Sequence, residues 1–349
     1  MSGSSLYQKY RPQEFSDVLG QDHIVKALQG ALKEKHPGHA YLFVGSRGTG
    51  KTSIARILAK ELEATDADIH EVDAASNTGV DNIRQLREEA AVMPFSSKRK
   101  VYIIDEVHML SKGAFNAFLK LLEEPPSHVV FILATTELEK VPETIQSRCQ
   151  VFTFKKPTQK VLSAMITRVA KKEGFTLEQA SSELIALLSE GSFRDALSIL
   201  QKILASSSDK KVSLDEVALV TGAPRIELIQ NVISDLHEGK SDGALKAVGE
   251  AVKANADMAI FALLLLQRLR ILLLMRYAPE VGGELAVDLP DTDRGFLEGL
   301  AKSTASKINS ETLRKVILAS IETSRSPVPE LPLELAIMEL SGEVLTKNQ

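Results

Sequence analysis

A glycine-rich run, GSRGTGKT at positions 45–52, is the part of this 349-residue chain best suited to chemistry. It fits the pattern G-x-x-x-x-G-K-[ST] at every fixed position, between an expected strand and an expected helix. Backbone N–H groups of such a loop point at phosphate oxygens, and the helix start adds partial positive charge. A glycine-rich turn without function is the weaker alternative, because both flanks match the pattern. The predicted nucleotide-binding residues are Gly45, Ser46, Arg47, Gly48, Thr49, Gly50, Lys51 and Thr52.

Within this loop, we expect Lys51 to reach the β- and γ-phosphates of ATP and the Thr52 hydroxyl to bind Mg²⁺. Asp105 and Glu106 follow the apolar run VYII, and acids at the end of a buried strand are unfavourable without a compensating cation. We therefore expect Asp105 to hold Mg²⁺, directly or through water, and Glu106 to act as general base on the attacking water. An acidic surface turn is an equal alternative for the two acids alone. The phosphate loop upstream favours catalysis, and the pair of acids indicates an ATPase rather than a passive nucleotide binder.

Thr136 ends a third apolar run, VVFILATT at 129–136. We expect it to lie between the phosphate loop and the acids and to position the water, although threonine is also common at strand ends. The seven histidines show no spacing typical of metal ligands. We expect all of them, His108 included, to be structural or surface residues.

The elements that must position these residues alternate between strands and helices from Tyr41 to Phe154. The strand candidates are apolar, β-branched and about five residues long, as strands buried on both faces of a sheet are. Alternation with helices predicts a parallel sheet covered by helices, an α/β fold. The expected strands are 41–45, 69–73, 101–105, 129–136 and 151–154, and the expected helices are 51–63, 80–93, 113–124 and 142–149.

After Phe154 the strand signals stop and helical periodicity continues. The run KKPT at 155–158 is typical of a linker, and TGAP at 221–224 is a second break before helices that we expect to end near Leu345. The chain is therefore predicted to form three parts. These are an α/β core at 1–156, a small helical domain at 157–222 and a larger helical domain at 223–349.

The bulk composition indicates a soluble protein with a core, at 44% hydrophobic and 25% charged residues. A net charge of −4 means that any nucleic acid would be bound by a local positive surface. The single cysteine excludes a disulfide framework and favours a reducing compartment. The N-terminal residues have no apolar signal segment. Met258–Met275 is strongly apolar but carries two arginines, so we expect a buried helix, no membrane partner and a cytoplasmic location.

Seven stretches carry a family resemblance: YQKYRPQEFSDVLGQ, GTGKTSIARILAK, DEVHMLS, FNAFLKLLEEPP, LATT, SRCQ and GSFRDALSILQK. Together they closely resemble the AAA+ clamp-loader ATPases, specifically the gamma/tau subunits of bacterial DNA polymerase III. The resemblance is strong over 6–222 and weak over 225–345. It implies a P-loop AAA+ domain with a five-stranded parallel sheet, a helical lid that carries sensor 2, and an all-α oligomerisation collar.

The resemblance also implies roles that spacing alone does not assign. Arg194 lies in a stretch similar to the sensor-2 helix, which implies contact with the γ-phosphate of its own subunit's ATP. Arg148 lies in the SRC motif of the arginine finger, which implies contact with ATP bound by the neighbouring subunit, where a guanidinium stabilises charge on the γ-phosphoryl group. The alternative for Arg148 is pairing with carbonyls at the end of its own helix. The segment expected to wrap the adenine contains Tyr10, Arg11, Pro12, Val18 and Leu19.

One departure from the family concerns zinc. The family usually carries a four-cysteine zinc module after the P-loop helix, but here KELEATDADIHEVD connects the helix directly to the next strand. We therefore expect ATP and Mg²⁺ as ligands and no zinc site. The chain also ends at Gln349 without the family's polymerase- and helicase-binding extension, which puts those two partners in doubt.

The family implies a hetero-pentamer with other clamp-loader subunits, a sliding clamp, and primer–template DNA gripped by helix N-termini and basic residues, at the bacterial nucleoid-associated replisome. A helix start with a capping box from Thr78 to Asp81 and the cluster SSKRK at 96–100 are the DNA candidates, although short basic loops are more often only solvated. Another AAA+ motor, such as a branch-migration motor, and a non-hydrolysing loader subunit are the competing functions. The DNA candidates are Asn77, Thr78, Arg84, Lys98, Arg99 and Lys100.

Overall fold

The computed structural model describes residues 5–34, 37–207, 209–287, 289, 291–303 and 305–340. The chain forms two compact units, Met1–Met165 with Ser189–Ser198, and Ile166–Leu188 with Ile199–Gln349. The finer division at 156 and 222 stays a prediction. The expected helix end near Leu345 lies outside the described residues.

The first unit is built around a five-stranded sheet in the order β2-β3-β4-β1-β5. All neighbouring strands pair in parallel, which confirms the predicted α/β fold. Each expected strand is present with its ends shifted by no more than one residue. The strands are β1 Ala40–Val44, β2 Ile69–Asp73, β3 Lys100–Asp105, β4 Val129–Thr135 and β5 Gln150–Thr153.

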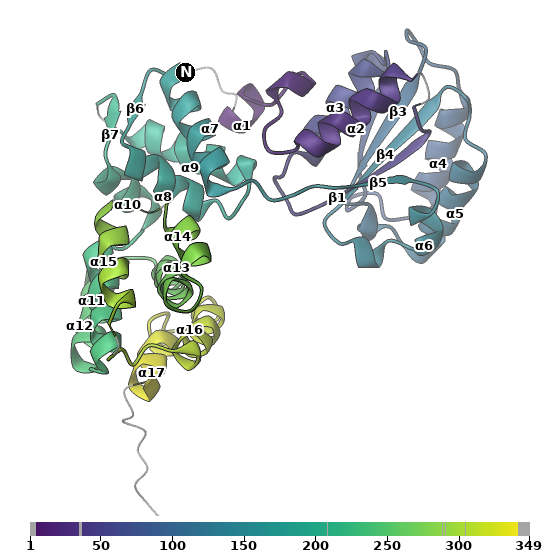
Figure 1. Cartoon of the computed structure of the whole chain (residues 1–349). Helices are drawn as coiled ribbons and strands as arrows, with labels where there is room; N and C mark the ends of the chain where they lie inside the picture. The colour runs from purple at the N-terminus through teal and green to yellow at the C-terminus, as the bar shows by residue number, and fades with distance from the viewer. Residues whose placement is uncertain are drawn as a thin grey trace, which may run out of the picture. The chain divides into compact units, whose positions relative to one another are not determined.

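Helices cover both faces of this sheet, with α2 and α3 on one side and α4 and α5 on the other (Figure 1). Successive residues of a strand point to opposite faces, so Leu42 packs in the core with α4 and α5 while Phe43 packs with α2 and α3. Burial on both faces is why the central strands β1, β3 and β4 read as continuous apolar runs. The helices of this unit are α1 Leu6–Lys9, α2 Asp22–Lys33, α3 Lys51–Glu61, α4 Val80–Ala91, α5 Lys112–Glu123 and α6 Glu143–Gln146. The short 3₁₀ turns are η1 Phe15–Asp17, η2 Asp66–Asp68, η3 Val107–Met109 and η4 Leu138–Lys140.

The second unit is mainly helical, and α7 and α9 have residues in both units. One feature differs from the expectation that strands stop after Phe154. Thr176–Leu177 (β6) and Lys211–Val212 (β7) pair as a small parallel sheet. Two residues are too few to show a periodic pattern. The helices are α7 Gln159–Lys172, α8 Gln179–Leu188, α9 Phe193–Ser206, α10 Leu214–Thr221, α11 Ile226–Glu238, α12 Asp242–Lys253, α13 Met258–Tyr277, α14 Pro279–Ala286, α15 Asp291–Ala301, α16 Ser310–Thr323 and α17 Leu331–Leu340.

Helix α13 is, within the described part of the chain, the one helix long and apolar enough to cross a bilayer by length and composition. It lies among the other helices of its unit, and 56% of its most apolar window is buried there (Figure 1). Its Arg268 is buried and pairs at 2.7 Å with Asp293, which also accepts a hydrogen bond from Gln230. The prediction of a buried core helix is confirmed.

Candidate nucleotide site

The phosphate loop runs from the end of β1 to the start of α3, as the sequence predicts. Gly48 has φ +75°, and a Cβ atom there would lie 2.9 Å from the Ser192 Cβ atom. Its carbonyl accepts a hydrogen bond of 2.9 Å from the Phe193 N–H. Only glycine fits this position, because a side chain would be strained by the left-handed backbone and would clash with Ser192.

Lys51 is the first residue of α3, and its side chain folds back over the loop. Its Nζ atom donates to the carbonyl oxygens of Gly45 at 2.7 Å and Ser46 at 3.1 Å. Burial lowers the pKa of Lys51, and the nearby charges of Glu106 and Asp105 oppose that shift. The ammonium group is therefore held at the loop, where phosphate oxygens can replace the two carbonyls.

Thr52 and Asp105 meet at the carboxyl edge of the sheet, where the Thr52 hydroxyl donates to Asp105 Oδ2 at 3.0 Å. A hydroxyl and a carboxylate are hard oxygen ligands of the kind Mg²⁺ prefers, and Mg²⁺ usually takes its other ligands from phosphates and water. Among the described residues, no group of three or more His, Cys, Asp and Glu side chains is placed to hold a metal ion. This pair therefore fits a Mg²⁺ ion that arrives with the nucleotide.

Glu106 follows Asp105 in a left-handed conformation, with φ +49° and ψ +44°. Its N–H donates to Asp105 Oδ1 at 3.0 Å, and its Oε2 accepts from the Thr136 hydroxyl at 3.2 Å. A non-glycine residue in this conformation is strained, and such strain is typical of functional sites. The structure thus brings together the predicted residues Lys51, Thr52, Asp105, Glu106 and Thr136.

His108 is a site residue that the spacing of the histidines did not indicate. Its Nδ1 lies 3.4 Å from Glu106 Oε2, and its Nε2 lies 3.2 Å from Glu137 Oε1. The sequence indicated His108 only as a structural or surface residue, and the structure places it beside Glu106. The sequence does not show the contact between His108 and Glu137, because Glu137 lies in a distant loop, the one after β4.

Gln21 is a second residue that the motifs did not single out. It is fully buried, and its Nε2 donates to Lys155 O at 2.7 Å while its Oε1 accepts from Lys155 N–H at 3.2 Å. Nε2 also lies 3.4 Å from Thr49 O. Gln21 therefore connects the N-terminal segment and the end of β5 to the phosphate loop.

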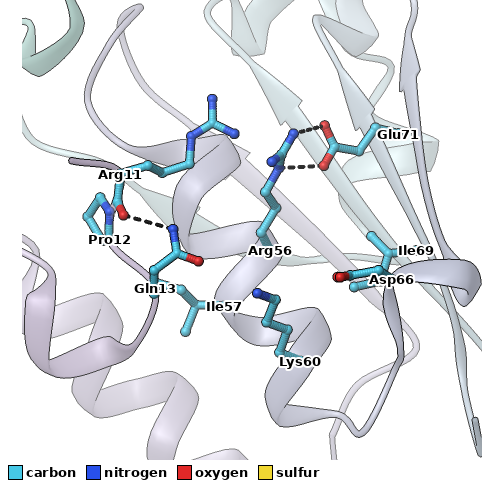
Figure 2. A pocket seen from close by; sticks show the side chains of 9 residues that line it. All are labelled: Arg11, Pro12, Gln13, Arg56, Ile57, Lys60, Asp66, Ile69 and Glu71. Carbon is cyan, nitrogen blue, oxygen red and sulfur yellow. Dashed lines mark hydrogen bonds and ion pairs between the residues drawn. The ribbon is translucent and has the colours of Figure 1, made fainter. Parts of the chain in front are cut away.

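Two predicted adenine-binding residues, Arg11 and Pro12, line a cavity of about 230 Å³ (Figure 2). Burial lowers the pKa of Arg11, and Arg56 on α3 contributes to that shift. Figure 2 shows Arg56 paired with Glu71 and Gln13 donating to the Arg11 carbonyl. No phosphate-loop residue is among the described residues that line the cavity. The adenine contacts of Tyr10, Arg11, Pro12, Val18 and Leu19 stay predictions.

Arg194 lies in the first turn of α9, directly after the residues that contact Gly48. Its guanidinium carbon lies 4.9 Å from the centre of the Tyr7 ring. Because Ser192 and Phe193 contact the loop at Gly48, the start of α9 is held next to the phosphate site. This placement is compatible with the sensor-2 role, which stays a prediction.

Arg148 follows α6, and its guanidinium is held within this chain. One nitrogen donates to Thr144 O at 2.9 Å, and another pairs with Glu123 Oε1 at 2.8 Å. Pairing with a carbonyl of its own helix, the alternative considered for Arg148, is thus observed in the single chain. The neighbouring Cys149 is free, and burial raises its pKa to about 12.

The DNA candidates need two corrections. No capping box runs from Thr78 to Asp81, because the N-cap of α4 is Gly79 and it makes no side-chain cap. Lys100 is buried as the first residue of β3 and donates to Glu89 O at 2.8 Å, so it is not available at the surface.

The other DNA candidates already have contacts within the chain or stay untested. Lys98 pairs with Glu63 at 2.7 Å and Arg84 with Asp81 at 3.0 Å, while Asn77 donates to Asp73 O at 2.9 Å.

Known proteins resemble this chain in sequence over most of its length. DNA polymerase III subunit tau of Bacillus subtilis (strain 168) is 42% identical over 320 residues, which are 85% of this chain and 57% of that protein. The gamma/tau subunit of Mycobacterium bovis is 34% identical over 96% of this chain and 62% of that protein. The chain is thus similar to DNA polymerase III gamma/tau subunits over most of its own length. A family model described as DNA polymerase III, delta subunit also matches residues 20–78 and 63–158 of this chain.

Solved structures support the fold of this chain. The Thermotoga maritima RuvB Holliday junction branch migration motor matches with a TM-score of 0.53 and 23% identity, over 65% of this chain and 79% of that one. At this identity the likeness shows the fold alone. This chain spans about 57–62% of the length of the two gamma/tau relatives named above.

Proposed function

We propose that this chain is an ATP-hydrolysing motor subunit of a replicative clamp loader, which loads a sliding clamp on primed DNA. The observation that carries the proposal is the meeting of Thr52, Asp105, Glu106 and Thr136 beside the buried Lys51. A non-hydrolysing subunit has no need of both acids in this arrangement. Similarity to DNA polymerase III gamma/tau subunits supports the clamp-loading context.

The geometry supports a division of labour among these residues. Lys51 would bind the β- and γ-phosphates, while Thr52 and Asp105 would hold Mg²⁺, which neutralises charge that develops on the phosphates. Glu106 would accept a proton from the attacking water, and Thr136, which donates to its Oε2, would keep the carboxylate turned toward that water. Gly48 contacts the start of α9, so nucleotide in the loop would be sensed at Arg194.

Arg148 would act in trans at the ATP of a neighbouring subunit. In this chain it is paired with Glu123, and both side chains are partly exposed, at 35% and 50%. A surface pair of this kind contributes at most about 1 kcal/mol, so a neighbour's γ-phosphate can replace Glu123. Hydrolysis would then depend on how the subunits are arranged.

The helical second unit would assemble with other loader subunits as a collar of a hetero-pentamer. Leu318 and Ile321 on α16 are 55% and 52% exposed, and Leu335 on α17 is 49% exposed. Exposed apolar side chains on successive turns of adjacent helices are typical of protein–protein interfaces. Replacing Leu318 and Leu335 by aspartate would therefore reduce assembly while the ATP affinity of the isolated chain is kept.

Primer–template DNA would be gripped through phosphates, without base readout and with strong salt dependence. Asn77, Thr78, Arg84, Lys98 and Arg99 remain the candidates after Lys100 is removed. We also propose that the chain binds no zinc and no membrane, and works in the bacterial cytoplasm at the nucleoid-associated replisome.

The experiment that tests the function is ATP turnover by the reconstituted loader, with and without sliding clamp and primed DNA. The proposal is supported if clamp and primed DNA together stimulate turnover. Lys51→Ala in this subunit should then abolish both this turnover and nucleotide binding. Turnover that ignores clamp and DNA contradicts clamp loading, and turnover that responds instead to branched DNA would favour a branch-migration motor.

A further inference from the structure

His108 lies between the expected catalytic base and a loop that no motif connects to it. Its imidazole is 6% exposed, and both ring nitrogens face oxygen atoms. Nδ1 lies 3.0 Å from Thr135 Oγ1 and 3.4 Å from Glu106 Oε2, while Nε2 lies 3.2 Å from Glu137 Oε1. A buried ring with contacts on both sides is held in one orientation, so it can pass a displacement from one contact to the other.

The hydroxyl of Thr135 connects Nδ1 of His108 to the backbone of Glu137. It donates to Glu137 O at 3.2 Å and accepts from the Glu137 N–H at 3.0 Å. A threonine hydroxyl has one proton, so Nδ1 of His108 donates to Thr135 Oγ1 when that proton goes to Glu137 O, and accepts the proton in the other tautomer. The same Nδ1 atom lies 3.4 Å from Glu106 Oε2, which also accepts from Thr136 at 3.2 Å. One oxygen of the Glu106 carboxylate is therefore held from two sides.

Glu137 begins the segment that ends at Arg148. Within it, Gln146 Nε2 donates to Leu138 O at 3.2 Å and to Val141 O at 2.7 Å, which closes the segment on itself. Val141 is buried against the sheet core. These contacts make the segment a single packed piece, so a displacement at Arg148 is expected to reach Glu137.

We propose that His108 is a positioning residue that couples Glu106 to the segment from Glu137 to Arg148. The inference rests on the proposed function, in which Glu106 serves this chain's own ATP and Arg148 serves the neighbour's. When Arg148 leaves Glu123 for the neighbour's nucleotide, Glu137 shifts, the imidazole follows, and the Glu106 carboxylate is reoriented. Hydrolysis at two adjacent sites is thereby linked through one side chain.

The test uses steady-state ATP turnover and equilibrium ATP binding of the reconstituted loader, with and without clamp and primed DNA. For His108→Ala, kcat is expected to fall about 10- to 100-fold, since a small misplacement of a reacting group can cost that much, while KM and Kd for ATP change less than about twofold. His108→Asn retains a donor near the Nδ1 position. It should recover basal turnover but not the stimulation, because it cannot reach Glu137.

A matched control is His128→Ala. His128 also contacts oxygens through its ring, with Nε2 at 3.0 Å from Ala90 O and 3.2 Å from Val92 O, but these contacts lie at the C-terminal end of α4 and involve no residue placed at the nucleotide site. This variant should keep both basal and stimulated turnover. The asparagine variant preserves most of the buried volume, so the inference can be judged even if His108→Ala fails to fold.

The possible failures are distinguishable. Normal kcat and stimulation in the His108 variants would overturn the inference, as would an equal loss of ATP affinity and turnover, which marks a purely structural role. Full recovery of stimulation in His108→Asn would refute the link to Glu137. If the unsubstituted loader neither hydrolyses ATP nor responds to clamp and DNA, the proposed function itself fails and takes the inference with it.

Discussion

Replacing Gly48 by alanine tests whether the start of α9 and the phosphate loop are packed as the structure shows. The left-handed backbone at φ +75° costs an alanine about 1–2 kcal/mol. The new Cβ would lie 2.9 Å from Ser192 Cβ and also meet its hydroxyl, an overpacking that costs about 1–3 kcal/mol. Together these effects predict a loss of about 2–5 kcal/mol in the free energy of unfolding. A loop displaced to relieve them should bind ATP about 10- to 100-fold more weakly.

The second substitution, Ser192→Gly, separates the two contributions. It removes the clashing atoms and leaves Ser192 Cα 3.4 Å from the new Cβ, so the double variant should keep only the backbone strain. The expected coupling between the two substitutions is about 1–3 kcal/mol. Losing the Ser192 cap on the Asp195 N–H should itself cost only a few tenths of a kcal/mol, roughly, because glycine is also a fair N-cap.

The assays are thermal unfolding and titration with a fluorescent ATP analogue. Gly30→Ala is a control that should raise the free energy of unfolding instead of lowering it. This glycine lies inside α2 with open space around it, so alanine there should stabilise the chain by about 0.5–1 kcal/mol. A Gly48→Ala chain with unchanged stability and ATP affinity would refute the packing argument, as would a double variant no more stable than the single one.

Three further predictions concern other parts of the first unit. Arg148→Ala should leave ATP affinity near normal while turnover of the assembled loader collapses; an equal loss of both would contradict a role in trans. Asp68→Asn should destabilise by about 1–3 kcal/mol at pH 7, because the buried carboxylate accepts from Phe95 N–H, Ser96 N–H and the Ser97 hydroxyl. Burial raises the pKa of Asp68, but these hydrogen bonds outweigh it and hold the pKa below its ordinary value. This stability is present above pH about 4 and is lost as the pH falls toward the folded-state pKa, so the difference from Asn should shrink in acid unfolding curves. Iodoacetamide at pH 8 should alkylate Cys149 much more slowly than a free cysteine, since partial burial raises its pKa to about 12; labelling as rapid as that of a free cysteine would count against that burial.

The sheet could be predicted because each of its central strands is buried on both faces and therefore shows a continuous apolar run. The phosphate loop and the acids were predictable for a related reason, since they occur where strands end and chain direction changes. The pair β6 and β7 could not be predicted, because two-residue strands carry no period. Lys100 appeared to belong to a basic surface cluster only because the sequence does not show that its strand begins inside the core.

The sequence also does not predict which side chains from distant segments contact one another. The imidazole of His108 contacts Glu106, two positions earlier in the sequence, and Glu137, 29 positions later. No sequence motif relates these three positions. Gln21 reaches Lys155 over an even longer separation. Such links depend on the sheet order β3-β4-β1, which places the ends of β3 and β4 side by side. Sequence patterns predict each strand but not which side chains meet beyond their ends.

The proposed role of Arg148 in trans would be seen only with a neighbouring subunit. Its guanidinium is satisfied here by Thr144 O and Glu123, yet neither contact is strong enough to hold it, because an exposed ion pair contributes about 0–1 kcal/mol. A γ-phosphoryl group carries more negative charge than a single carboxylate and offers bidentate geometry, which favours a guanidinium. In the proposed function the same weak contact would serve two states: it gives Arg148 a defined position in the free subunit, and it would allow exchange when a neighbour presents nucleotide. A stronger, buried partner for Arg148 would have been incompatible with a role at a subunit interface.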